Sequence, residues 1–329
     1  MGQVFNGIPR KSIIKWGVIA VAVVMLLTLP LWWNDLYVIN IVILIFSYLA
    51  LGEMWNFLGG YAGLPSLGQQ VFVGIGGYAM AVMLQTYKQP IFLCLAASFV
   101  FCVIFALAIS APIFNLSKMY FTIGTCILSL AVSAWFSNWD FVHYNAGINI
   151  SRAFNFPPMT LYLLSVGIGL FSVAAVYIIL RTKWGLGLMA MRDNAKAAEV
   201  RGVKLYQNKL WVFLISAGIT GVTGGIIYLN LGYIKTDSAF SMNWTITCVF
   251  MVIIGGIGTI EGPIIGAFIY ILLRQLLYNF PGLSMIILGC IAVVAILVMP
   301  KGIMGILQKW NFDIFSVRRA VKKRPQTGL

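Results

Sequence analysis

Residues 184–202, WGLGLMAMRDNAKAAEVRG, place an Ala-rich, charged and helix-compatible sequence between two long apolar segments of the chain. The apolar segments extend without a charged residue over residues 153–180 and 210–234. Each is long enough to cross a bilayer, which takes roughly 20 apolar residues. The pattern predicts membrane spans joined by a polar loop that another protein can bind in the cytoplasm.

The composition of the whole chain supports this interpretation. Of the 329 residues, 61% are hydrophobic and 9% are charged, and the mean hydropathy is +0.95. Soluble domains are about 45–50% apolar and about 25% charged. We therefore expect an all-α polytopic membrane protein, organised as a single transmembrane domain over residues 1–329.

Uncharged intervals define about ten expected spans, because an ionised side chain at the bilayer centre costs about 2.5–3.5 kcal/mol on insertion scales. One of the ten is allowed to carry Arg274. The expected spans cover residues 13–33, 38–58, 66–84, 91–113, 119–138, 160–180, 211–231, 241–257, 263–280 and 284–300. The first is expected to be a retained helix and not a signal peptide, since no small-residue cleavage pattern follows it.

Basic residues predict the orientation, because Lys and Arg accumulate on the cytoplasmic side. Of the 22 basic residues, three precede Trp16, seven lie in residues 181–209 and seven lie between Lys301 and Arg324. Ten spans place all three clusters on one side. We expect both termini in the cytoplasm, with a cytoplasmic coupling loop at 181–209 and a basic C-terminal tail at 301–329. The formal net charge of +14 is then explained by anionic membrane lipid and not by nucleic acid.

The sequence offers no recognisable enzyme constellation. It contains no G-x-x-x-x-G-K-[ST] phosphate loop, no nucleophile elbow and no H-E-x-x-H helix. The five cysteines lack metal-ligand spacing, and the single histidine, His143, cannot form a metal site alone. We therefore expect no enzymatic activity, no metal and no cofactor in this chain. Any energy from a nucleotide must then come from another subunit.

Two glycine-rich segments interrupt the apolar spans. Residues 56–78 read NFLGGYAGLPSLGQQVFVGIGGY, and residues 254–266 read IGGIGTIEGPIIG. Glycine removes side-chain bulk and proline removes an amide donor, so such segments can hold broken or closely packed helices at membrane depth. Paired interruptions in two halves of a transporter often mark the pathway. Close packing of small residues is the alternative.

Polar side chains in and beside the first segment are candidates for the solute pathway: Glu53, Asn56, Ser66, Gln69 and Gln70. They could hydrogen-bond a passing solute, or they could satisfy freed backbone groups. Glu53 is the sharpest anomaly, because an acid within a span is a functional candidate by default. Its expected position near the inner end would let it reach water or a basic partner, and Arg274 could extend out of its span in the same way. A structural role is favoured for both.

Within the polar loop, Asn194 is expected to cap a short helix over residues 195–200, which Gly202 then terminates. The alanines of this helix would form a slim face that a partner protein can approach closely, and its charged neighbours would form a rim. The residues expected to couple to such a partner are Arg192, Asp193, Asn194, Ala197, Ala198, Glu199 and Gly202. An ordinary solvated loop helix is the alternative.

Three blocks of this sequence resemble the inner-membrane permeases of branched-chain amino acid ABC importers and the related urea and short-amide permeases. The blocks are GYAGLPSLGQQVFVGIGGYA at 60–79, GLGLMAMRDNAKAAEVRGV at 185–203 and GGIGTIEGPIIG at 255–266. With similar span spacing, the resemblance covers about residues 38–305. The sequence departs from the family pattern at Pro65, where an aliphatic residue is usual, at Gln69, where histidine is frequent, and at Glu53. Residues 138–151 also lack the usual run of glycines.

The resemblance implies an importer in the bacterial or archaeal plasma (inner) membrane. Two permease subunits, identical or related, would form the pathway, two cytoplasmic ATPase subunits would bind ATP and Mg, and an extracytoplasmic solute-binding protein would deliver the solute. The implied solutes are branched-chain or other aliphatic amino acids, with urea or short amides second. The alternative from another class is a self-sufficient secondary transporter in which Glu53 exchanges protons or ions.

Overall fold

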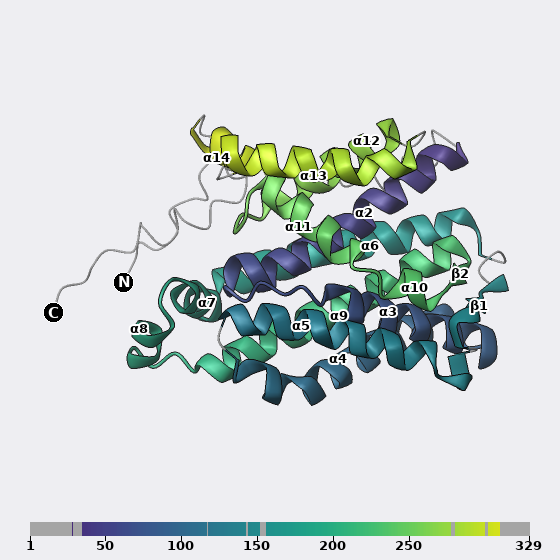
Figure 1. The fold of residues 1–329 in the computed structure, drawn as a ribbon, viewed down its shortest axis with the longest axis horizontal. Helices are drawn as coiled ribbons and strands as arrows, with labels where there is room; N and C mark the ends of the chain where they lie inside the picture. The colour runs from purple at the N-terminus through teal and green to yellow at the C-terminus, as the bar shows by residue number, and fades with distance from the viewer. Residues whose placement is uncertain are drawn as a thin grey trace, which may run out of the picture.

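The computed structural model describes residue 28 and residues 35–116, 118–142, 144–151, 156–277, 280–299 and 302–309. The expected span at 13–33 lies outside these residues apart from Thr28. Long helices lying side by side dominate the described part of the chain (Figure 1). The expectation of an all-α polytopic membrane protein is confirmed.

Three helices form the centre of the molecule: α2 (Leu36–Asn56), α3 (Gln69–Ala81) and α9 (Leu205–Leu231). Helix α9 contacts both of the others. The backbones of α3 and α9 lie so close that a Cβ atom on Gly76 would collide with the carbonyl group of Gly221. Small residues at helix contacts let two backbones approach this closely. The resulting van der Waals packing favours helix association in membranes.

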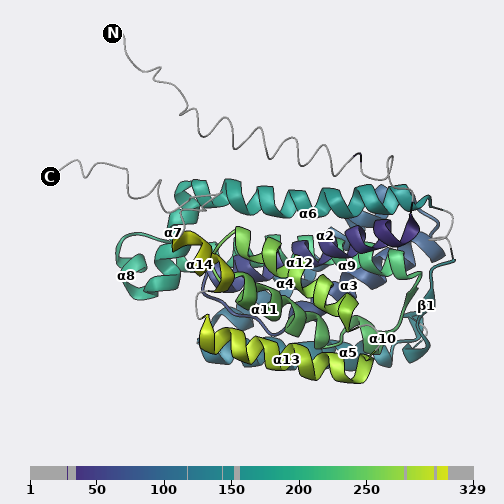
Figure 2. The same ribbon diagram turned by 90° about the horizontal axis from the view of Figure 1, so that it is seen from above.

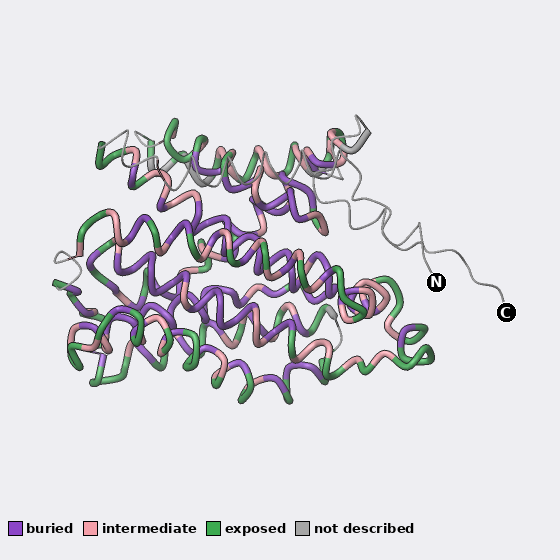
Figure 3. The backbone as a smooth tube through the Cα atoms, turned by 180° about the vertical axis from the view of Figure 1, so that it is seen from behind, coloured by how far each residue is buried: buried purple, intermediate pink, exposed green. Residues whose placement is uncertain are grey.

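Six further apolar helices of the described chain surround this centre. They are α4 (Ile91–Phe114), α5 (Lys118–Ser137), α6 (Pro158–Arg181), α11 (Asn243–Gly255), α12 (Glu261–Leu276) and α13 (Pro281–Val298). Seen from above, α6 lies along one edge of the molecule, and α13 lies along the opposite edge (Figure 2). Most residues of α9 are buried, whereas most of α4 and α5 are not (Figure 3).

The two ends of the molecule are built differently. At one end lie α7 (Lys183–Asp193), α8 (Ala195–Val200) and α14 (Gly302–Lys309), and we call this the α7–α8 end (Figure 1). The other end, the β1–β2 end, contains the short helices η3 (Asp140–Val142), η4 (Tyr144–Ala146) and α10 (Thr236–Ala239). There β1 (Ile148–Asn149) pairs antiparallel with β2 (Tyr233–Ile234), with Ile148 opposite Ile234.

Among the described residues, six helices are long and apolar enough to cross a membrane. They are Leu36–Tyr61, Ile91–Phe114, Met119–Ser137, Pro158–Arg181, Leu205–Leu231 and Thr236–Gly255. The expected spans at 66–84, 263–280 and 284–300 also form helices, but these are not among the six. Helix α3 begins with two glutamines, and α12 has only 16 residues. The count of ten spans and the cytoplasmic location of both termini stay predictions.

Candidate functional site

The chain leaves regular helical structure between α2 and α3, in a segment that we call the first break (residues 57–68). Helix α2 continues into a π-helical turn, η1 (Phe57–Tyr61), and residues 62–68 are irregular. Most of the break is buried, with Pro65 as its exposed exception. The indole Nε1 of Trp55 donates to the carbonyl oxygen of Ser66 at 2.8 Å. Buried backbone groups need such partners because no water reaches them.

A second break (residues 256–260) separates α11 from α12, and Asn56 joins it to the first. The Asn56 side chain donates through Nδ2 to the carbonyl oxygen of Thr259 at 2.8 Å. Its Oδ1 accepts from the amide of Gly258, also at 2.8 Å. Gly258 has a φ of +72°, a conformation that glycine adopts without strain. Both ends of the Asn56 amide are therefore occupied by the protein.

Gln70 and Ser66 also have partners within the protein. Gln70 donates through Nε2 to Ser129 Oγ on α5 at 2.8 Å, and its Oε1 accepts from Thr245 Oγ1 on α11. Ser66 Oγ accepts from the amide of Gly68 at 3.1 Å. These contacts fit the alternative in which polar groups tie helices and backbone together.

Gln69 and Glu53 differ from their neighbours because they keep unpartnered oxygen atoms. Gln69 donates through Nε2 to Thr220 Oγ1 at 2.6 Å, but its buried Oε1 accepts no hydrogen bond from any residue that the structure describes. Glu53 is fully buried, and neither carboxyl oxygen has a hydrogen-bond partner in the described part of the chain. A second buried acid, Glu261, stands at the start of α12, a helix that contacts α2. Within the described residues, the Ser47 and Tyr228 hydroxyls are also buried without a hydrogen-bond partner, so four interior residues keep unused hydrogen-bonding capacity, and of these only Gln69 and Glu53 were candidates for the pathway.

Arg274 on α12 contacts Tyr48 on α2. Its Nη1 donates to the Tyr48 hydroxyl at 3.1 Å, and its guanidinium lies 5.8 Å from the centre of the Tyr48 ring. The arginine is exposed and is held by a partner on a neighbouring helix, a contact that fits the structural role favoured for it.

The helix expected in the polar loop is present as α8, and its predicted caps are confirmed. Asn194 Oδ1 accepts from the amide of Ala197 at 3.1 Å. At the other end, Gly202 has a φ of +84° and donates its amide to the carbonyl oxygen of Glu199 at 2.8 Å. Sequence reasoning missed α7, which precedes α8. The signal for α7 was Thr182, whose Oγ1 accepts from the amide of Gly185 at 3.4 Å.

The exposed surface of α8 differs from the alanine face that the sequence suggested. Ala198 is 2% exposed, because this side of α8 contacts α9. Ala197 and Glu199 are exposed, as are Asp193 and Asn194 before the helix. Val200, which sequence reasoning missed, is 90% exposed. Arg192 points inward instead, and its Nη1 donates to the carbonyl oxygen of Gly60 in the first break at 2.9 Å.

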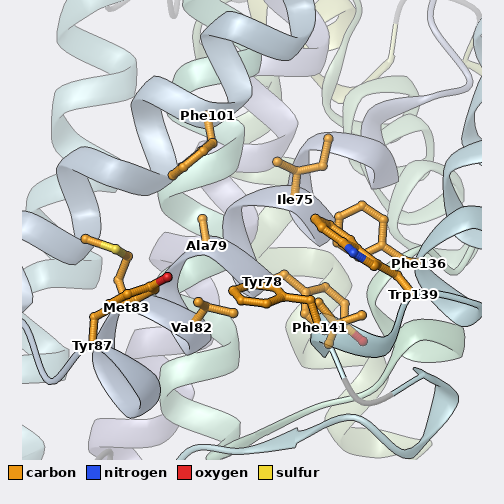
Figure 4. A pocket seen from close by; sticks show the side chains of 11 residues that line it. Ile75, Tyr78, Ala79, Val82, Met83, Tyr87, Phe101, Phe136, Trp139 and Phe141 are labelled. Atoms are coloured by element: carbon orange, nitrogen blue, oxygen red, sulfur yellow. The ribbon is translucent and has the colours of Figure 1, made fainter.

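The β1–β2 end contains a half-open cavity of about 210 Å³ that the sequence did not indicate (Figure 4). Aliphatic side chains of α3 and η2 (Val82–Thr86) line one part of it. Its aromatic lining comes from Tyr78, Tyr87, Phe101, Phe136, Trp139 and Phe141. The only available signal was the density of aromatic residues in 135–141, WFSNWDF.

Comparison with known proteins gives consistent results. A family model described as branched-chain amino acid transport system / permease component matches residues 36–296. The high-affinity branched-chain amino acid transport system permease protein LivM of Escherichia coli (strain K12) is 23% identical over 298 residues, covering 81% of this chain and 69% of the relative. The LivM protein of Salmonella typhimurium (strain LT2) is 23% identical over 304 residues, with the same coverage.

A shorter similarity extends to archaea. A probable branched-chain amino acid transport permease protein LivH of Methanocaldococcus jannaschii is 25% identical over 142 residues, covering 40% of this chain and 44% of that protein. No solved structure matches the chain.

Proposed function

Since this chain belongs to the family of permease components of branched-chain amino acid transport systems, we propose that it forms half of the membrane pathway of an ATP-driven importer. The observation that carries the proposal is the extent of the family match, which includes both breaks and the whole polar loop. A second permease subunit, identical or related, supplies the other half. The location is the bacterial or archaeal inner membrane, with ten spans and both termini in the cytoplasm.

The energy for transport comes from partner subunits in this proposal. Two cytoplasmic ATPase subunits bind ATP and Mg and dock on α8, and an extracytoplasmic solute-binding protein delivers the solute. Helix α8 suits docking, because Val200 offers an exposed apolar side chain within a polar surface. Burying a valine contributes about 1.5–3 kcal/mol. A change in the distance between the ATPase subunits would bias the pathway between outward and inward access.

The solute that the family supports best is a branched-chain amino acid, with urea or a short amide second. Gln69 is the interior residue best suited to contact it, because its Oε1 is buried and unpartnered. This oxygen can accept a hydrogen bond from an ammonium or amide group of a passing solute. Its environment carries no fixed charge from α3 itself, which suits a solute of low net charge.

The test uses the assembled complex in vesicles with ATP inside and a labelled branched-chain amino acid outside. We expect excess unlabelled leucine to compete for uptake and urea or acetamide not to compete. The reverse pattern would transfer the assignment to an amide solute and leave the permease role intact. A complex that takes up none of these solutes would overturn the assignment.

Two variants test the contact at Gln69. Gln69→Leu removes the free acceptor and should raise the KM of uptake about 2- to 12-fold, the equivalent of about 0.5–1.5 kcal/mol for one hydrogen bond. Thr220→Val is the matched control, because it removes the partner of Gln69 Nε2 and leaves Gln69 Oε1 in place. The control should change KM less than twofold. Equal effects of both variants would assign Gln69 to packing.

A self-sufficient secondary transporter is the second candidate function, favoured by the buried and unpartnered carboxyl of Glu53. The discriminating measurement uses vesicles that contain this chain alone under a pH gradient. Solute accumulation there, abolished by Glu53→Gln, would support proton coupling. Accumulation only in the complete complex with ATP supports the importer.

A further inference from the structure

Arg192, at the end of α7, lies where both breaks and the polar loop meet. Its side chain is 28% exposed, and its Nη1 donates to the carbonyl oxygen of Gly60 at 2.9 Å. This contact joins residues 132 positions apart in the sequence. A single residue, Asn194, separates α7 from the docking helix α8. Arg192 is therefore partly buried against the first break, whereas its neighbour Asp193 is 70% exposed.

The carbonyl oxygen of Gly60 needs a donor from outside its own helix. In an α-helix it would accept from the amide of Leu64, and in a π-helix from that of the next residue. The Leu64 amide instead donates to the carbonyl oxygen of Leu58 at 3.0 Å. The next residue is Pro65, which has no amide hydrogen. The guanidinium of Arg192 replaces the missing donor.

Two glycines leave a slot for the arginine side chain. A Cβ atom on Gly63 in the first break would lie 2.9 Å from Arg192 Cγ. A Cβ atom on Gly258 in the second break would lie 3.0 Å from Arg192 Nη1. The first distance is shorter than real Cβ contacts, the second is at their tight limit, and both glycines have positive φ angles, +71° and +72°. A side chain at Gly63 would force Arg192 to move, and one at Gly258 would be strained by its backbone conformation and would press on the guanidinium.

The neighbouring Asp193 orients the guanidinium. Its Oδ1 accepts from Arg192 Nε at 3.0 Å and lies 3.0 Å from Nη2, so Nη1 is left to face Gly60. Asp193 is 70% exposed, and an exposed ion pair of this kind contributes about 1 kcal/mol or less. The Arg192–Asp193 ion pair therefore orients the guanidinium but is too weak to fix the position of α7.

We infer that Arg192 is the positioning residue that transmits displacement of α7 and α8 to the two breaks, an inference that rests on the proposed importer function. A movement of α8 must move Arg192, because only Asn194 separates the two helices. Movement of Arg192 displaces its Nη1 from the carbonyl oxygen of Gly60 and from its place beside Gly258. Gly258 is bonded to Asn56, so both breaks respond together.

The test compares Arg192→Met with Arg201→Gln in the complete complex with ATPase subunits and binding protein. Both variants remove one positive charge from the same loop, but Arg201 is exposed at the end of α8. The readouts are retention of the ATPase subunits on purification, ATP turnover without solute, and the amount of solute taken up per ATP. If the complex transports another solute, the ratio is measured for that solute.

We expect Arg192→Met to retain the ATPase subunits and ATP turnover without solute, and to lower the uptake per ATP at least tenfold. Arg201→Gln should keep all three values within twofold of the wild type. Arg192→Lys should lower the ratio two- to fivefold, because one ammonium group replaces the planar guanidinium that serves both Asp193 and Gly60.

A loss of ATPase retention in Arg192→Met that matches its loss of uptake would overturn the inference and return Arg192 to the docking surface. An unchanged uptake per ATP would also overturn it. Should Arg192→Met fail to fold, Arg192→Lys decides, and an unchanged ratio in that variant would reject the inference. A wild-type complex that moves no branched-chain amino acid would count against the proposed solute, whereas these ratios concern Arg192 alone.

Discussion

The α7–α8 end and the β1–β2 end make their contacts with different kinds of groups. Near the first, glycines, one asparagine amide and one guanidinium hold backbone against backbone at the two breaks. At the second, aromatic rings pack around a cavity, with Phe136 and Phe240 4.9 Å apart and the parallel rings of Tyr78 and Phe240 6.1 Å apart. Where two backbones touch, no side chain can move aside to make room for an added group. Aromatic rings beside a cavity can shift into the empty volume. We expect substitutions near the α7–α8 end to have the larger effects.

The largest expected contrast is in accessibility from the two sides of the membrane. Asp237 at the β1–β2 end and Lys196 at the α7–α8 end are both exposed. A single cysteine replacing Asp237 should react with an impermeant thiol reagent added outside intact cells, and one replacing Lys196 should react only after lysis. The labels are counted on the purified chain. The opposite pattern would reverse the proposed orientation.

The next contrast concerns α8, the helix that we propose as the docking site of the ATPase subunits. Val200→Asp should weaken co-purification of the ATPase subunits about 10- to 150-fold, since it replaces about 1.5–3 kcal/mol of apolar burial with a charge. Glu199→Gln is the matched control on the same helix and should change retention about fivefold or less. Equal retention in both variants would place the docking surface elsewhere. Ala198→Trp would be a poor probe, because Ala198 packs inward.

A methyl group tests the backbone contacts directly. A Cβ atom on Gly60 would collide with Asn56 Oδ1 and lie 2.8 Å from the amide of Gly258. Gly60→Ala should therefore lower the free energy of unfolding by about 1–3 kcal/mol, the range for overpacking. Gly167→Ala on α6 is the control, because its Cβ would have no neighbour within 4 Å. It should stabilise by up to about 1 kcal/mol through helix propensity. The unfolding temperature of the purified chain is the measurement, and similar values for both variants would contradict the contrast.

The smallest effect is expected among the rings. Phe136→Leu should cost about 1 kcal/mol, because the lost aromatic pairs contribute about 0.5–1.5 kcal/mol and the rings beside the cavity can shift to fill the space. Phe101→Leu, which lines the same cavity but is 53% exposed, should cost less. The same unfolding measurement applies. A loss for Phe136→Leu as large as that for Gly60→Ala would show that the two ends are equally rigid.

Local features were predictable from the sequence, and long-range partners were not. The caps of α8 depend on Asn194 and Gly202, which lie within a few residues of the groups that they bind, and both were identified. Uncharged apolar runs likewise indicated the long helices, because such a run is a property of consecutive residues. The number of spans is harder to predict from the sequence, because α3 and α12 are short and carry polar or small residues where they meet other helices.

The candidate site shows where sequence reasoning ends. Asn56 and Gln70 were identified as polar groups, but their partners Thr259 and Thr245 lie 203 and 175 positions away. No local pattern separates such a group from Gln69, whose Oε1 has no partner. The same limit hid the inward direction of Arg192, since its acceptor arises from a break in another part of the chain.

The bonds of Asn56 also set a constraint on the order of events during biosynthesis. Asn56 and Thr259 are 203 positions apart. At about 5–20 residues per second, the ribosome adds that length in about 10–40 s. For that interval the Asn56 amide has neither of its final partners, and an unpaired amide in an apolar environment is destabilised by several kcal/mol. Until the second break has been synthesised, the Asn56 amide must therefore be hydrated or be bound by the insertion machinery.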